Sequence, residues 1–329
     1  KEIIIQYLSK NYDYCYLSAM HEKNRREGVE TIIVGSSHSM NGLLERRMEE
    51  GGWGRTINFS ISSQDIWFDY QHVKKALTEA KQKIQYCIIC FGYYMLYQDL
   101  SQSTLLNFLL PKVYAPLFGT DNMHHMEVKT PEDPLVQMEY DRESFPDKVI
   151  LPICEHWARE VLCEQASYYG DLVYREEHRT PGLKKTGWTG RSEVEKHQIA
   201  SERAADHNKL KKYTSSREEN GRLLSEMIGY LVQHGVRPLV LITPYTKYYN
   251  QYIDPAYRED IYQLLESIPW PLEFFDMNDY ADEFVDTDFM DSDHLSLAGA
   301  EKTTLLLNQY LQIIQEDAER GAAEEAGTI

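Results

Sequence analysis

Five short apolar runs along the chain are predicted to form β-strands. The runs are continuous rather than alternating, which is typical of strands covered on both faces, as in a parallel sheet. They span residues 31–34, 57–59, 87–91, 238–243 and 272–275.

Helical periodicity separates most of these strands. Between the second and third runs, apolar residues recur at the spacing of one helix face. These residues are Ile66, Tyr70, Val73, Leu77, Ala80 and Ile84.

The fourth run is preceded, and the fifth followed, by a further predicted helix. Leu224, Ile228 and Leu231 form a stripe before the fourth run, residues 215–218 have the spacing of a capping box, and Gly235 stands where a C-terminal cap belongs. After the fifth run, a closing helix is expected, and its polar, Ala/Gly-rich end at 316–329 is expected to fray. The stripe of this closing helix is Leu306, Tyr310, Ile313 and Ile314.

Alternation of strands and helices predicts an α/β doubly wound sheet within a single domain, residues 1–329. Residues 93–215 do not follow this rhythm and are interpreted as a long, partly helical insertion after the third strand. Ligands of open α/β sheets bind at the carboxyl ends of the strands. A substrate-shaping cap and a structural elaboration are therefore about equally compatible with this stretch.

Charge narrows the classes of partner. The 329 residues carry 34 Lys and Arg against 52 Asp and Glu, a formal net charge of −18. This balance argues against binding nucleic acid or anionic lipid, both of which select basic surfaces. No apolar run approaches the roughly 18 residues that span a bilayer, and no secretory signal is visible. Because the chain begins at Lys1 rather than Met, we expect a processed or trimmed product, and a removed signal or anchor is compatible with the sequence.

The five cysteines do not form a disulfide framework, because they are few and odd in number for so long a chain. Cys87 and Cys90 spell CxxC, but they lie inside a predicted strand, where positions three apart point to opposite faces. This favours a structural interpretation over redox chemistry or metal binding.

Two loops carry residues suited to nucleophilic catalysis. Ser37 follows the first strand, at the edge where side chains and backbone N–H groups are exposed. Asp291 precedes His294 by three residues, so its carboxylate can orient an imidazole that acts as a base. Helix caps at Ser36, Ser37 or Ser39, and at Asp291 or Asp293, are the alternative interpretation of both loops.

A third loop, residues 58–64, follows the second strand, and its backbone is a candidate donor to an oxyanion. All three loops follow predicted strands, and parallel strands bring such loops to one edge of the sheet.

Together these loops resemble the SGNH (GDSL-type) hydrolase superfamily. Gly35-Ser36-Ser37 matches the Gly-Asp-Ser block, which implies Ser37 as the nucleophile. Asp291-Ser292-Asp293-His294 matches the last block, which implies Asp291 as the acid and His294 as the base. The resemblance implies a flavodoxin-like three-layer α/β/α sandwich with five parallel strands in the order 2-1-3-4-5.

The two middle blocks depart from the family pattern. Ser63 stands where the oxyanion glycine belongs, although its backbone N–H remains a donor. Tyr94 stands where the oxyanion Asn belongs, and Ser36 replaces the Asp of the first block. The resemblance therefore implies a serine esterase or acyltransferase with oxyanion donors at Ser63 and Tyr94. A catalytically degenerate domain that binds a glycan or an acyltransferase partner is the alternative.

The same residues look like bacterial members that modify envelope polysaccharides and teichoic acids. This implies a carbohydrate or small acyl-ester substrate, no cofactor, an extracytoplasmic location and a membrane-anchored acyltransferase partner. The unpaired cysteines, in contrast, favour a reducing compartment such as the cytoplasm.

Other polar and aromatic residues are weaker candidates. His124 and His125 do not predict a metal site, because adjacent histidines rarely share an ion and no further ligand stands at zinc-type spacing. Trp188, near Lys184 and Lys185, is either a sugar-stacking platform or part of the packing, which we favour. His38 either lines the pocket or packs on the sheet edge.

Overall fold

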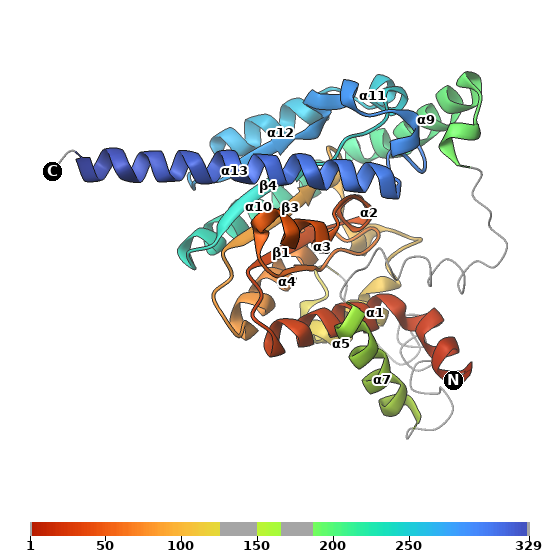
Figure 1. Ribbon diagram of the computed structural model, residues 1–329. Coiled ribbons are helices and arrows are strands. Elements are labelled where there is room, and N and C mark those ends of the chain that lie inside the picture. The colour runs from red at the N-terminus through yellow and green to blue at the C-terminus, as the bar shows by residue number, and fades with distance from the viewer. Residues whose placement is uncertain (1, 126–149, 166–186, 328–329) are drawn as a thin grey trace.

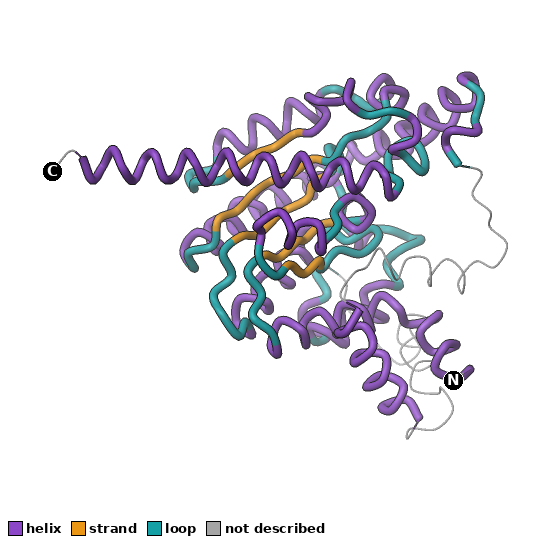
Figure 2. Tube along the Cα trace, viewed as in Figure 1, coloured by secondary structure: helices purple, strands orange, loops and turns teal. Residues whose placement is uncertain are grey.

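A five-stranded, wholly parallel β-sheet forms the centre of the structure (Figure 2). The computed structural model describes residues 2–125, 150–165 and 187–327. The strands lie in the order β2-β1-β3-β4-β5, which confirms the predicted α/β class and the 2-1-3-4-5 order. Their ends fall within one residue of the predicted runs. The strands are β1 (Thr31–Gly35), β2 (Thr56–Asn58), β3 (Tyr86–Phe91), β4 (Arg237–Ile242) and β5 (Glu273–Asp276).

Helices cover both faces of the sheet and make it the middle of three layers (Figure 1). Successive side chains of a strand point to opposite faces. Accordingly, Ile32 and Val34 of β1 belong to one buried core and Ile33 belongs to the other. The first core is closed by α1 (Glu2–Arg26), α4 (Ile66–Glu79), α10 (Thr214–Gln233) and α12 (Ala256–Ser267). The second is closed by α3 (Glu45–Met48) and α13 (Leu297–Gly327), with α2 (Ser37–Gly42) beside α13.

The stretch after β3 contains α5 (Ala115–Phe118), α7 (Ile150–Gln165) and α9 (Glu193–Asn208), so the predicted insertion is partly helical. α7 packs against α1, whereas α9 packs against α11 (Lys247–Tyr252), which follows β4. Different parts of the insertion are therefore attached to different parts of the fold.

Two local predictions about the helices need correction, and a third is confirmed. The helix predicted between the second and third strands, α4, ends at Glu79 because Ala80 is extended, so Ile84 lies outside it. The capping box predicted at 215–218 is wrong, since α10 begins at Thr214 without a side-chain cap. Gly235, with φ +69°, does occupy the turn that ends α10, and its N–H bonds to Val232 O.

The closing helix α13 is longer than predicted. It continues through the expected frayed tail to Gly327, and its end projects beyond the body of the fold (Figure 1). Alanine and glutamate, which dominate this segment, are strong helix formers and account for the difference. Among the residues that the structure describes, no helix is both long and apolar enough to cross a bilayer.

A pair of buried histidines joins α1 to α4. His21 Nε2 and His72 Nδ1 lie 2.9 Å apart and share one proton in a hydrogen bond. The rings pack against Phe59 and Phe118. Burial lowers the pKa of His72 to about 3 and also holds the pKa of His21 well below its usual range. Both imidazoles are therefore neutral in the folded protein at neutral pH.

This pair should weaken the fold in acid. The unfolded chain binds a proton at each histidine below about pH 6.5, but the folded chain does so only near pH 3 for His72. The His72 linkage alone should therefore remove about 2 kcal/mol of unfolding free energy between pH 7 and pH 5. Urea denaturation at pH 7 and at pH 5 measures how much unfolding free energy is lost between the two pH values. This loss should be about 2 kcal/mol smaller in His72→Phe than in wild type.

The comparison with wild type cancels the other titrating groups. The exposed His234, changed to Gln, is the matched control. An equal pH dependence in His72→Phe and wild type would contradict this account of the buried pair.

Candidate active site

The turn after β1 places Ser37 at the first position of α2. Gly35 has φ +147°, and a Cβ there would lie 2.5 Å from Cys90 O and 2.6 Å from Ser39 Oγ. Only glycine fits this close approach to β3. Ser36 stands at the N-cap position but makes no side-chain cap hydrogen bond. The turn therefore presents Ser37 at the carboxyl edge of the sheet.

A short closed loop carries the acid and the histidine. An antiparallel bridge joins Phe289 to Leu295, and Thr246 Oγ1 donates to Ser292 O at 2.7 Å, which ties the loop to the segment after β4. The helix-cap interpretation of Asp291 and Asp293 is wrong, because α13 begins only at Leu297.

Ser37, His294 and Asp291 form one hydrogen-bonded chain, although Ser37 and His294 are 257 residues apart in sequence. Ser37 Oγ lies 2.8 Å from His294 Nε2. The Asp291 carboxylate lies 3.0 and 3.1 Å from Nδ1 of the same ring, and its Oδ1 accepts the His294 backbone N–H at 2.8 Å. This arrangement directs the free lone pair of Nε2 at the serine hydroxyl.

Sequence patterns did not identify the carboxylate of Asp293 as a second one beside His294. Asp293 is 2% exposed and accepts both hydrogen bonds of its ion pair from Nε of Arg203, at 3.0 and 3.1 Å. His38 also approaches Asp293, at 3.5 Å, and its ring stacks on His294 with 4.8 Å between centroids. His38 thus packs behind the candidate base rather than lining the pocket. Arg203 comes from α9, so only the fold reveals this contact.

The charges around His294 favour its protonated form. Burial by itself disfavours the imidazolium, but Asp293 and Asp291 outweigh this effect and raise the pKa of His294 above its usual value. The hydrogen bond from His294 lowers the pKa of Asp291 despite its desolvation. An imidazolium formed by taking the serine proton would therefore be stabilised.

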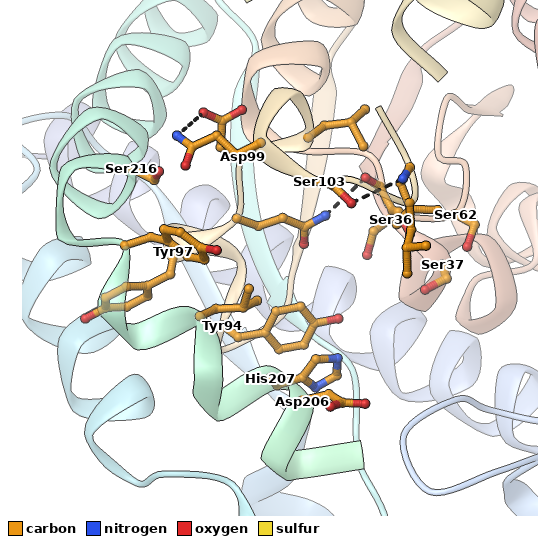
Figure 3. Close-up of a pocket in the computed structure, with 18 of the residues that line it drawn as sticks. Ser36, Ser37, Ser62, Tyr94, Tyr97, Asp99, Ser103, Asp206, His207 and Ser216 are labelled. Atoms are coloured by element: carbon orange, nitrogen blue, oxygen red, sulfur yellow. Dashed lines mark hydrogen bonds between the residues drawn. The ribbon is translucent and has the colours of Figure 1, made fainter. Parts of the chain in front are cut away.

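The two predicted oxyanion residues line the same pocket as Ser37. Ser63 has φ +65°, a conformation that favours glycine, and its carbonyl accepts a hydrogen bond from Gln98. The Tyr94 ring stacks on His207 at 3.6 Å, and burial raises the pKa of its hydroxyl, which stays protonated (Figure 3).

The pocket has a volume of about 650 Å³, which suits a small ligand (Figure 3). Serine, threonine, glutamine and charged side chains line it together with tyrosine rings and four leucines. Part of the wall comes from the predicted insertion, namely from helix α9 and the turn that follows it. These contribute Arg203, Asp206, His207, Leu210 and Tyr213.

The remaining sequence candidates do not contribute to this pocket. Cys87 and Cys90 are buried free thiols in β3. Trp188 is 2% exposed and donates to Asp286, which leaves no ring face for a sugar. Lys184 and Lys185 lie outside the described residues.

Comparisons with known proteins do not assign this chain. No model of a known protein family matches it, and a search of curated proteins finds no relative. The geometry of the site is therefore the basis for any functional conclusion.

Because His294 must be neutral to accept a proton, the reactivity of Ser37 should rise with pH through a pKa above about 6.5. Removing the charge of Asp293 should lower the pKa of His294 and so move this rise in reactivity, the acid limb of the pH profile, to lower pH. The test is the rate of Ser37 labelling by a fluorophosphonate as a function of pH in wild type and Asp293→Asn. The exposed Asp282, changed to Asn, serves as control. A limb that moves to higher pH in Asp293→Asn would refute the electrostatic assignment.

Proposed function

We propose that this protein is a serine esterase, or an O-acyltransferase that uses the same acyl-enzyme. The observation that carries the proposal is the hydrogen-bonded chain from Ser37 through His294 to Asp291. A serine, a histidine and a carboxylate in this geometry are the parts that acyl transfer requires.

The first half of the reaction forms the acyl-enzyme. His294 takes the proton of Ser37 as its Oγ attacks the ester carbonyl, and Asp291 stabilises the resulting imidazolium. His294 then gives this proton to the departing alcohol. In the second half, water or a sugar hydroxyl attacks the acyl group, and its proton passes to His294 and back to Ser37.

Backbone N–H groups of Ser37 and Ser63 are the proposed donors to the oxyanion, with the Tyr94 hydroxyl as a third. The left-handed conformation of Ser63 supports this role, since glycine, the residue of the resembled family here, adopts it readily. Tyr94 lies in the pocket with Ser37 and keeps its proton, as a donor must.

The proposed substrate is a small O-acyl group on a carbohydrate of the cell envelope. The polar side chains and tyrosine rings of the pocket suit a hydroxyl-rich ligand better than a long acyl chain, which needs an apolar channel. From the resemblance to the SGNH superfamily, we further propose an extracytoplasmic location and a membrane-anchored acyltransferase as partner.

The nucleophile is tested with an aryl acetate and a serine-directed fluorophosphonate. Wild type should turn over the ester and be labelled, whereas Ser37→Ala should lose labelling and at least about 10³-fold in kcat/KM, because no other group can form the acyl-enzyme. Ser267→Ala, at an exposed serine that bonds only its own helix, is the matched control.

Equal labelling of Ser37→Ala would show that the nucleophile is wrong. Absence of turnover and labelling in wild type would instead favour the degenerate, ligand-binding alternative.

Tyr94→Phe tests the third oxyanion donor. The phenyl ring can keep the stacking on His207, so the fold should be retained while kcat falls by about 10²-fold with little change in KM. Unchanged kcat in steady-state kinetics would limit Tyr94 to packing.

A further inference from the structure

His124 and His125 stand beside two buried carboxylates that the sequence places far from them. The two imidazole rings stack, with 4.0 Å between centroids. At one end of the stack, Asp99 lies 3.3 Å from His124 Nδ1 and 2.9 Å from His125 Nδ1. Asp65 lies 3.9 Å from the same nitrogen of His124. The Nδ1 atoms of both histidines thus face the Asp99 carboxylate, and Asp65 lies beside His124.

The His124 side chain is 2% exposed, yet neither of its ring nitrogens has a hydrogen-bond partner among the described residues. Asp65 and Asp99 are likewise almost fully buried, at 1% and 2% of their side-chain surface. Buried polar groups are normally paired, and adjacent buried carboxylates repel each other. A cation between these groups would resolve both problems.

We infer that Asp99, His124 and His125 bind a divalent transition-metal ion, with Zn²⁺ as the best match. Asp65 stands beside this group, but its two carboxylate oxygens already accept the backbone N–H groups of Phe68 and Leu100. Imidazole and carboxylate together are ligands that Zn²⁺ prefers. Ligand atoms of a tetrahedral Zn²⁺ site lie about 3.4 Å apart, as follows from bond lengths near 2.1 Å. The two separations of Asp99 from the histidines, 3.3 and 2.9 Å, lie near this value, and the ligand atoms of Asp99, His124 and His125 all lie within 4.8 Å of one another.

The surrounding residues have the character of an outer shell. Glu219 of α10 lies at the other end of the stacked rings, 3.7 Å from His124 Nε2 and 3.1 Å from His125 Nε2, where it can accept the N–H of a metal-bound imidazole. Ser101 and Gln102 donate to Asp99 and orient its carboxylate. The Trp67 ring covers His124 at 4.7 Å.

Three protein ligands leave the fourth position of a tetrahedral site to a water molecule or another small ligand. The ion would cross-link the segment after β3, which carries Asp99, to the segment that carries the histidines. Asp99 also lines the pocket, on a different side from Ser37 (Figure 3), so the ion would fix part of the pocket wall.

The test is metal binding by the whole chain. Protein stripped with a chelator and dialysed against Zn²⁺ should retain one ion per chain, and Co²⁺ in its place should show the intense visible absorption of a tetrahedral site. His125→Ala, at a half-exposed ring, and Asp99→Asn should lose the ion. Glu219→Gln should keep the stoichiometry but weaken affinity about 10–100-fold, as outer-shell changes do.

His234→Ala, at an exposed histidine directly after α10, is the matched control and should bind as wild type does. His294→Gln separates this site from the other histidine–carboxylate group, that of His38, Asp293 and His294, and should also bind normally. The inference is overturned if wild type retains no Zn²⁺, if both His125→Ala and Asp99→Asn retain it, or if only His294→Gln loses it. Circular dichroism of each variant identifies loss of folding as a separate event.

Discussion

The parallel direction of all five strands is the constraint on which the site depends. The carboxyl ends of all strands of such a sheet lie at the same edge, so the loops after β1, β2 and β3 meet there. The strands β4 and β5 end at this edge too, although they follow much later in the chain. The order 2-1-3-4-5 reverses direction between β1 and β3, and Ser37 and Tyr94 follow these two strands. The crevice at this reversal is where doubly wound sheets bind ligands.

Around His294, two carboxylates act in different ways. Asp291 is about half exposed and bonds directly to the imidazole, so it sets the orientation of the ring. Asp293 is buried and bonds to Arg203 instead, so its charge acts on His294 through space. Pairing with Arg203 offsets the cost of burying Asp293, which would be several kcal/mol for an isolated charge. The insertion helix α9 is thereby joined to the loop that carries Asp291 and His294.

The insertion also builds the far wall of the pocket. The segment after β3 contributes Asp99, and α9 contributes Arg203 and His207. If the inferred ion is bound, the same wall is held at both ends, by the Arg203–Asp293 ion pair and by the metal. A pocket assembled from segments so distant in sequence needs such cross-links, because loop segments without them open at little cost in free energy.

The sequence by itself determined the strands, their parallel arrangement and the candidates Ser37, Asp291 and His294. Continuous apolar runs and short motifs are local patterns, and local patterns survive in a single sequence. Its errors were local too: side chains at 215–218 have the spacing of a cap that α10 does not use. Only the tertiary structure decided that Ser37 Oγ lies against His294 Nε2, that Arg203 reaches Asp293, and that Asp65 and Asp99 surround His124. These contacts join residues whose separation along the chain carries no periodic signal, so the packing of the elements alone specifies them.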